Sequence, residues 1–313
     1  MFSIGIDIGG MSIKVGLVDA NGTIVAKNVV KTAKTADICI SNMVAQINQL
    51  LSDNNLIVRD LKGIGIGCPG AVSSDSGVVN FLPNLGWINI PLRERLQNYF
   101  NLPIKISNDA NVATLAEVLY GSAKEFSTAI MFTLGTGVGG GIVIDNKLYE
   151  GTNGRGAELG HCTLILNGKP CTCGRNGCVE AYVSATALIE QTKEAMLEDR
   201  SSILWQYSHG DINNVDGKMA FTAEKQGDVT AKKVIDNYVT YLSESILNML
   251  NIFRPEAFIL GGGISQQGEN LTRRVTEYLE KFDYGYKFAP KTKVITASLG
   301  NDAGIIGASA LVL

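Results

Sequence analysis

The most specific chemical signal in the sequence is a group of three thiols near an imidazole. Cys171, Cys173 and Cys178 fall within eight positions, and His161, one of only two histidines, precedes Cys171 by ten residues. Three thiolates and one imidazole make a closed tetrahedral zinc site. We expect a structural zinc ion, because four protein ligands leave no position for a reacting water. The alternative is a set of buried or redox-active thiols.

Three glycine turns are candidates for phosphate sites. Such turns let backbone N–H groups approach a phosphate without an intervening Cβ atom. None ends in the Gly-Lys-Ser/Thr of a Walker A loop, and the first two precede a strand, which fits a dinucleotide fingerprint poorly. Each could equally be an ordinary tight hairpin. The candidates are Gly9-Gly10-Met11-Ser12, Gly135-Thr136-Gly137 and Gly261-Gly262-Gly263.

Two aspartates stand where a carboxylate could do chemistry. Asp7 comes just before the first glycine turn and could hold Mg²⁺ through water, or be an ordinary residue at a strand end. Asp109 lies between an expected strand and an expected helix. There it could accept a proton from a hydroxyl group, or simply cap the helix.

The elements that must position these groups include a repeated pattern. Residues 3–19 and 128–145 each show a β-branched strand, a glycine turn and a second strand ending at Asp. The recurrence predicts a duplicated unit, one in each lobe, although two unrelated hairpins would look the same.

Elsewhere strands and helices alternate, which predicts an α/β fold. We expect further strands at residues 23–30, 61–68, 104–107, 257–260 and 294–298, and helices at 36–53, 91–100, 109–120, 228–253, 266–281 and 302–313.

Composition bounds the class of protein. The 313 residues predict two lobes, and the 45% of hydrophobic residues is typical of a folded protein. A net charge of −3 without a basic cluster argues against nucleic-acid binding, and no apolar run is long enough for a membrane helix.

The start lacks signal-peptide features, so we expect a cytoplasmic protein with reduced thiols. Cys39, Cys68 and Cys162 are isolated and read as buried apolar side chains.

Together these motifs resemble the ROK family of sugar kinases and sugar-responsive repressors, along almost the whole chain. The similar segments are the hairpin Asp7 to Lys14, Cys68-Pro69-Gly70 with Pro83 to Trp87, Asn108-Asp109-Ala110-Asn111, Gly156 to His161, and Cys171 to Ser184. One departure is Met11, where the family usually has Thr. Ser12 or the backbone N–H groups could replace the missing hydroxyl.

The resemblance implies an α/β, two-lobed ASKHA fold (actin-like ATPase, ribonuclease H-like) with an interlobe cleft. Residues 1–118 plus 301–313 would form the small lobe, and residues 119–300 the large lobe. It also implies ATP-dependent phosphorylation of a hexose 6-hydroxyl, with Asp109 as catalytic base. The implied sugar ligands are Gly70, Asn108, Asp109, Glu158, His161 and Glu180. The implied ATP and Mg²⁺ site consists of Asp7, Gly9, Gly10, Met11, Ser12, Lys14, Gly135, Thr136, Gly137, Gly261, Gly262 and Gly263.

The segment from Pro83 to Trp87 favours glucose as the sugar. N-acetylmannosamine, a β-glucoside, fructose and allose remain alternatives. A sugar-sensing regulator without kinase activity is a third interpretation. The intact Asn108-Asp109 pair and the start of the first strand at about residue 3, with no room for a helix-turn-helix before it, argue against that. The family suggests a homodimer or homotetramer.

We also expect the zinc to organise the sugar-binding carboxylates Glu158 and Glu180. Because the glycine turns lie outside the metal-binding segment of the sequence, ATP binding should survive loss of the metal.

Overall fold

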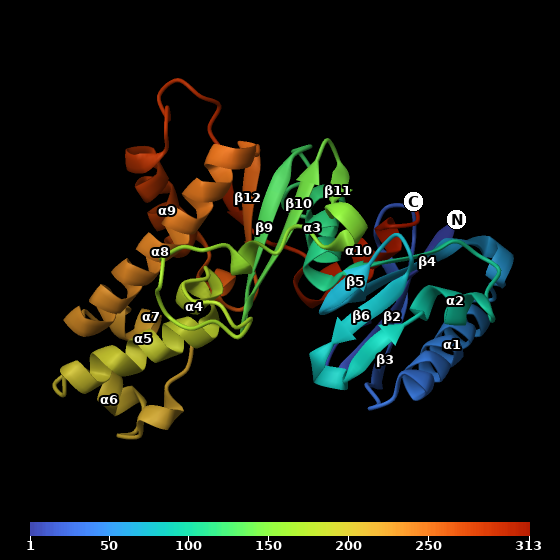
Figure 1. The fold of residues 1–313 in the computed structure, drawn as a ribbon, viewed down its shortest axis with the longest axis horizontal. Coiled ribbons are helices and arrows are strands. Elements are labelled where there is room, and N and C mark those ends of the chain that lie inside the picture. Colours follow the sequence, from blue (N-terminus) through green and yellow to red (C-terminus); the bar gives the residue numbers. More distant parts are fainter. The chain divides into compact units, whose positions relative to one another are not determined.

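A computed structural model describes residues 1–313. Strands and helices alternate along the chain (Figure 1), as the sequence predicts. The strands are β1 (Phe2–Ile8), β2 (Ser12–Val18), β3 (Ile24–Lys31), β4 (Leu61–Cys68), β5 (Ala71–Ser73), β6 (Val78–Leu82), β7 (Trp87–Ile90), β8 (Ile104–Asn108), β9 (Ala129–Leu134), β10 (Val138–Ile144), β11 (Lys147–Tyr149), β12 (Ala257–Gly261) and β13 (Lys293–Thr296). The α-helices are α1 (Ala36–Asp53), α2 (Leu92–Gln97), α3 (Asp109–Leu119), α4 (Glu180–Val183), α5 (Ala185–Glu198), α6 (Leu204–Tyr207), α7 (Met219–Lys225), α8 (Val229–Phe253), α9 (Glu269–Phe282) and α10 (Ala303–Ala310).

The chain divides into two compact units. The first unit comprises residues 1–131, 141–157 and 298–313, and the second comprises residues 132–140 and 158–297. The lobe boundaries drawn from the sequence stay a prediction.

The first unit contains a five-stranded sheet with the order β3-β2-β1-β4-β8. Strands β1, β4 and β8 are parallel, whereas β2 and β3 run antiparallel to their neighbours. On one face, Ile4, Ile6 and Ile8 of β1 are buried in a core shared with the apolar side of α1. This face follows from the alternation of side chains along a strand.

The other face of this sheet carries a row of glycines beneath α10. Gly5 of β1 pairs with Gly16 of β2 and with Gly65 of β4. A Cβ atom on Gly65 would lie 1.7 Å from the carbonyl oxygen of Ala308, and one on Gly5 would lie 2.0 Å from that of Ile305. Only glycine therefore allows α10 to pack this closely on the strands.

A second five-stranded sheet has the order β11-β10-β9-β12-β13. Within the second unit, α8 packs against α5, α7 and α9 (Figure 1). Its first turn is capped by Asp228, whose carboxylate accepts the N–H of Ala231 at 2.7 Å. The helix ends at Phe253, and the next residue, Arg254, takes a left-handed conformation (φ +44°) just before Pro255. The prediction of a helix at residues 228–253 is confirmed.

Other predicted elements are shorter or divided. The expected helix at residues 266–281 is broken by Gly268 (φ +58°) into a 3₁₀ turn at Ile264–Gln267 and α9. The sequence did not predict a small antiparallel sheet, β5-β6-β7, or the helices between residues 180 and 225. Each of these strands and most of these helices has fewer than eight residues, too short to show a clear period.

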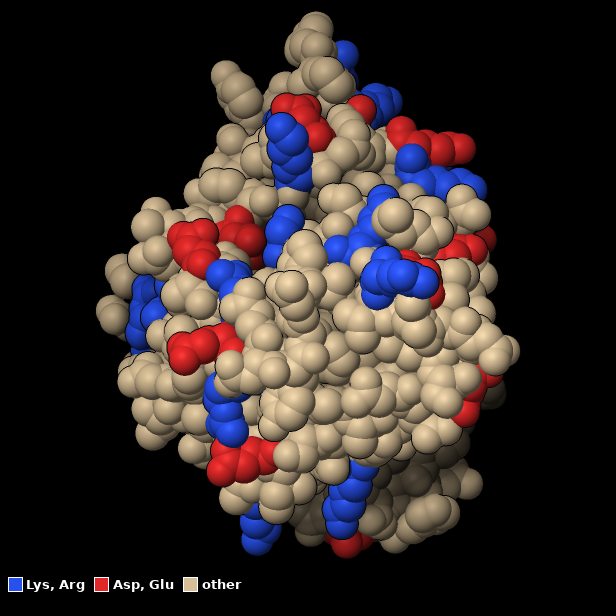
Figure 2. Space-filling view, turned by 90° about the vertical axis from the view of Figure 1, so that its right-hand side faces the viewer, with Lys and Arg blue, Asp and Glu red and all other residues tan.

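No helix combines the length and the apolar character needed to cross a bilayer. On the face shown in Figure 2, Lys and Arg side chains intermingle with Asp and Glu side chains.

Candidate active site

In the first unit, the predicted catalytic groups meet at one edge of the sheet. Asp7 lies near the end of β1 opposite Gly67, and Cys68 at the end of β4 lies opposite Asn108 at the end of β8. Because these strands are parallel, their carboxyl ends share an edge. Burial raises the pKa of the Cys68 thiol, and the nearby carboxylates of Asp109 and Asp7 raise it further. The carboxylates of Asp109 and Asp7 therefore both lie near the Cys68 thiol.

Asp109 is the first residue of α3 and is exposed. The N-cap is Asn108, whose Oδ1 accepts the N–H of Ala110 at 2.9 Å, and Asp109 Oδ1 accepts the same N–H at 2.9 Å. The capping position that the sequence offered to Asp109 thus belongs to its neighbour. The first turn of a helix favours a carboxylate in its ionised form, which suits a general base.

Asn108 and Gly70 are linked directly. The side-chain amide of Asn108 donates to the carbonyl oxygen of Gly70 at 3.3 Å. Gly70 adopts φ +83°, and a Cβ atom there would lie 2.4 Å from the carbonyl oxygen of Phe81. Two predicted sugar ligands therefore lie beside Asp109.

The first glycine turn joins β1 to β2 and is held by Thr32, the residue that follows β3. The Thr32 hydroxyl donates to Gly9 O at 2.7 Å, and its N–H donates to Met11 O at 3.0 Å. Met11 itself is 87% exposed. A trans peptide points its C=O and N–H in opposite directions, so the N–H groups of Gly10 and Ser12 point away from Thr32.

An ion pair lies at the base of this turn. Lys14 Nζ is 2.9 Å from Asp7 Oδ2 and also donates to the carbonyl oxygen of Asn301 at 3.1 Å. The start of α10 closes over Asp7, since a Cβ atom on Gly304 would lie 2.7 Å from the Asp7 carboxyl carbon. The structure therefore brings Asp7, Lys14 and the first turn together.

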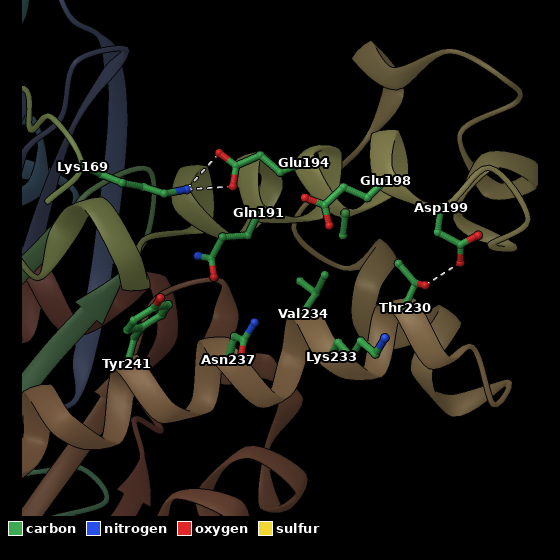
Figure 3. A pocket seen from close by; sticks show the side chains of 11 residues that line it. Lys169, Gln191, Glu194, Glu198, Asp199, Thr230, Lys233, Val234, Asn237 and Tyr241 are labelled. Atoms are coloured by element: carbon green, nitrogen blue, oxygen red, sulfur yellow. Dashed lines mark hydrogen bonds and ion pairs between the residues drawn. The ribbon is translucent and has the colours of Figure 1, made fainter.

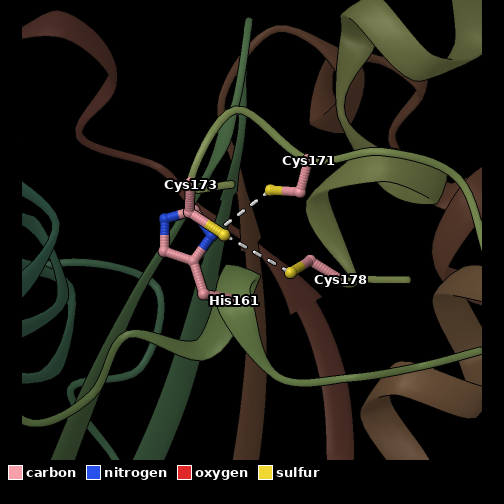
Figure 4. Close-up of side chains that lie close together, drawn as sticks. All are labelled: His161, Cys171, Cys173 and Cys178. Atoms are coloured by element: carbon pink, nitrogen blue, oxygen red, sulfur yellow. Dashed lines mark hydrogen bonds between the residues drawn. The ribbon is translucent and has the colours of Figure 1, made fainter. Parts of the chain in front are cut away.

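In the second unit, the predicted metal ligands converge on a common centre (Figure 4). Their ligand atoms all lie within 4.8 Å of one another. In a tetrahedral zinc site with Zn–S bonds of about 2.3 Å, two sulfurs stand about 3.8 Å apart and a sulfur and a nitrogen about 3.6 Å apart. Cys173 Sγ is 3.7 Å from Cys178 Sγ, and Cys171 Sγ is 3.6 Å from His161 Nδ1. These two distances fit such an ion.

Of the three thiols, that of Cys178 is buried and that of Cys173 is exposed. Burial raises the pKa of the Cys178 thiol to about 12, and the neighbouring Cys173 and Cys171 raise it as well. A bound dication would deprotonate a coordinating thiol.

The predicted sugar carboxylates of this unit differ in their surroundings. Glu158 is exposed, and its carbonyl oxygen accepts the N–H of His161 at 3.0 Å. Glu180 is half-buried, and Oε2 accepts the N–H of Val138 at 3.0 Å. Glu180 is therefore tied to the start of β10, whereas the Glu158 carboxylate faces solvent.

The second and third glycine turns lie side by side. The second joins β9 to β10, and the third follows β12, the strand next to β9 in the sheet. Gly262 adopts φ +80°, and a Cβ atom there would lie 2.5 Å from the carbonyl oxygen of Leu134, the residue before Gly135. The structure thus places two of the predicted phosphate turns in one region of the second unit.

The sequence profile of the ROK family matches residues 3–313. This chain belongs to the ROK family. It is 35% identical to the glucokinase of Halalkalibacterium halodurans, over 99% of this chain and 94% of that protein. It is 31% identical to the xylose repressor of Bacillus subtilis, over 100% of this chain and 77% of the repressor.

Among solved structures, the chain is similar to a ROK family glucokinase from Streptomyces griseus in complex with glucose and AMPPNP. The TM-score is 0.81 and the identity 32%, with 99% of each chain covered. The predicted α/β, two-lobed fold of the ROK family is confirmed.

The ROK site residues predicted from the sequence fall into two groups. Asp7, the first glycine turn, Lys14, Gly70, Asn108 and Asp109 gather in the first unit, and the other two turns, the metal cluster and Glu180 gather in the second. Their roles toward sugar and nucleotide stay predictions.

Sequence reasoning missed the groups that support these residues. Thr32 carries no motif, and neither does Thr186, whose hydroxyl donates to Thr136 O at 2.8 Å. Glu117 of α3 is fully buried and accepts the backbone N–H groups of Ser122, Ser298 and Leu299, each at 2.8 Å. Acid residues in a helix usually read as exposed, so no sequence signal pointed to this one.

A cavity of about 570 Å³ lies between α5 and α8 (Figure 3). Its walls carry both signs of charge, and Lys169 pairs with Glu194 at 2.9 Å across its rim. None of the predicted site residues lines it.

Proposed function

We propose that this protein is an ATP-dependent glucokinase, which transfers the γ-phosphoryl group of ATP to the 6-hydroxyl of glucose. The observation that carries the proposal is Asp109, an exposed carboxylate at the start of α3, at the same sheet edge as Asp7 and the first glycine turn. Support also comes from ROK relatives that are glucokinases and from the similar structure bound to glucose and AMPPNP.

In this proposal Asp109 is the general base. It accepts the proton of the 6-hydroxyl while the sugar oxygen bonds to the γ-phosphorus and ADP leaves. A sugar hydroxyl is a poor nucleophile, so positioning and neutralisation of charge supply most of the acceleration. Asn108, Gly70, Glu158, His161 and Glu180 hold the sugar hydroxyls. The free ring nitrogen of His161 can face the sugar while Nδ1 faces the metal.

The glycine turns bind the nucleotide through backbone N–H groups. Asp7 is a partly exposed carboxylate beside such a turn, which suits Mg²⁺, an ion usually held by one or two carboxylates together with substrate phosphates. When bound, Mg²⁺ neutralises charge on the phosphate oxygens. Lys14, now paired with Asp7, can also reach toward phosphate.

The metal in the cluster is structural zinc, one per chain, held by His161, Cys171, Cys173 and Cys178. Four ligands leave no open position for catalysis. Elemental analysis of protein purified without added metal should find about one zinc per chain. Zinc-free protein with six freely titratable thiols would contradict the assignment.

The test of the activity is ADP release measured with a panel of hexoses. We expect glucose to show the highest kcat/KM. A higher value with N-acetylmannosamine, a β-glucoside, fructose or allose would reassign the substrate within the same reaction. If the protein bound a sugar but released no ADP in the presence of any sugar, a sugar-sensing regulator would be favoured instead. That is the role that the xylose repressor's name indicates for that relative.

The same proposal places the enzyme in the cytoplasm as a homodimer or homotetramer. Light scattering of the purified protein would test the assembly.

A further inference from the structure

The second glycine turn is bonded to the segment that follows the metal ligand Cys178. That segment runs through α4 into the first turn of α5. Three hydrogen bonds join the two: Ala185 N–H to Gly135 O at 2.7 Å, Thr186 Oγ1 to Thr136 O at 2.8 Å, and Val138 N–H to Glu180 Oε2 at 3.0 Å.

Two of these bonds decide which way the turn presents its N–H groups. The carbonyl oxygens of Gly135 and Thr136 face α5. Since C=O and N–H point in opposite directions across a trans peptide, the N–H groups of Thr136 and Gly137 point away from α5. Those are the donors that a phosphate at this turn would need.

Glu180 bridges the metal loop and the turn with one carboxylate. Oε2 accepts the N–H of Val138, and Oε1 accepts the hydroxyl of Thr172 at 3.0 Å and lies 3.6 Å from Cys171 Sγ. A Cβ atom on Gly137 would lie 2.4 Å from Oε2. A side chain at this position would therefore displace the Glu180 carboxylate from the turn.

The residues just before His161 pack on β10, the strand that begins at Val138. A Cβ atom on Gly160 would lie 2.0 Å from the carbonyl oxygen of Val138, and one on Gly140 would lie 2.6 Å from the side chain of Leu159. The start of β10 is thus contacted by the segments on both sides of the metal ligands. An ion that joins His161 to the cysteines holds these two segments at a constant separation.

We propose that the metal cluster holds the second glycine turn in its phosphate-binding shape, through Glu180 and the first turn of α5. Glu180 and Thr186 are positioning residues for the nucleotide, and loss of the metal weakens ATP binding. This inference rests on the proposed function. It reverses the expectation from the sequence that ATP binding survives loss of the metal, because contacts in space join segments that lie far apart in the chain.

The experiment is calorimetric titration of the full chain with AMPPNP and Mg²⁺ in the absence of sugar. The protein is compared with its zinc, after chelation of the zinc, and as three variants. We expect chelation to raise the Kd at least about fivefold, and Thr186→Val to raise it about two- to tenfold, the range for one lost hydrogen bond. Thr186→Ser keeps the hydroxyl and should bind like the wild type. Glu180→Gln should weaken AMPPNP even without sugar, which a role limited to the sugar would not explain.

Coupling between the metal and Thr186 gives the sharper readout. If both act on the same turn, Thr186→Val should have a smaller effect in zinc-free protein than in zinc-loaded protein. Circular dichroism checks that each sample is folded. If chelated protein does not fold, the pair Thr186→Val and Thr186→Ser in zinc-loaded protein decides the matter.

Unchanged AMPPNP affinity in folded, zinc-free protein and in Thr186→Val would overturn the inference and leave the proposed function standing. No binding of AMPPNP by the zinc-loaded wild type would instead remove the proposed function, and the inference with it.

Discussion

The first and second glycine turns share one pattern of strand, turn and strand, but different parts of the chain support them. The first is held by Thr32, which lies 23 positions from Gly9, just beyond the neighbouring strand β3. The second is held by Glu180 and Thr186, which lie 42 and 50 positions from their partners and follow the predicted metal ligand Cys178.

Two copies of one sequence pattern can therefore be held in place by different kinds of contact. The first turn needs only a three-stranded meander, which forms from contacts close in sequence. The second depends on contacts between residues far apart in the chain and, in our proposal, on a metal ion. The second turn should therefore depend on metal and on remote mutations, whereas the first should not.

The largest effect should come from the carboxylate at the start of α3. Asp109→Asn is expected to lower kcat at least about a hundredfold, the usual size of a lost general base. Calorimetry should show unchanged affinity for glucose and AMPPNP. Asp37→Asn, in the first turn of α1, is the matched control and should keep normal turnover. Near-normal turnover of Asp109→Asn would remove the assignment of chemistry to the first unit.

A smaller effect should follow from damage to the metal cluster. Cys173→Ala is expected to release the metal and to raise the KM for glucose about tenfold or abolish activity, because Glu158 and Glu180 lose their common anchor. Steady-state kinetics and metal analysis measure both changes. Cys162→Ala, outside the cluster, should keep the metal. Unchanged glucose affinity in folded, zinc-free Cys173→Ala would show that the metal does not organise the sugar ligands.

The two turns should also differ when each receives a methyl group. Gly137→Ala brings Cβ to 2.4 Å from Glu180 Oε2, whereas at Gly10 the nearest atom, Asn84 Nδ2, is 3.9 Å away. We expect Gly137→Ala to lower the free energy of unfolding by about 1–3 kcal/mol, and Gly10→Ala to change it by less than about 0.5 kcal/mol. Urea unfolding without ligands measures both. Equal losses of unfolding free energy in the two variants would contradict the claim that the two turns are held differently.

The smallest effect concerns Ala157, which precedes Glu158 and adopts φ +62°. The left-handed conformation costs a non-glycine residue about 1–2 kcal/mol, and glycine recovers part of this against its own larger loss of entropy. Ala157→Gly should therefore raise the free energy of unfolding by about 0.5 kcal/mol. Ala195→Gly within α5 should instead lower it by about 1 kcal/mol. A loss of stability in Ala157→Gly would show that this backbone conformation is not strained.

The start of α3 shows how far sequence reasoning reaches. The junction of strand and helix at residues 108 and 109 was predicted correctly, because the apolar strand and the helical period meet there. The sequence left open whether Asp109 caps the helix. The structure gives the cap to Asn108 and leaves Asp109 in the first turn, a distinction that depends on where β8 ends by pairing with β4.

The sequence by itself determined the glycine hairpins, the grouping of His161 with three cysteines and most of the longer strands and helices, because each depends on residues close together in the chain. Local spacing decides whether a turn is tight or whether four donor atoms can reach one ion. Only the tertiary structure decided which groups hold each turn. Thr32, Glu180 and Thr186 meet their partners through sheet pairing and helix packing, and hydrogen bonds across 23 to 50 positions leave no periodic trace in the sequence.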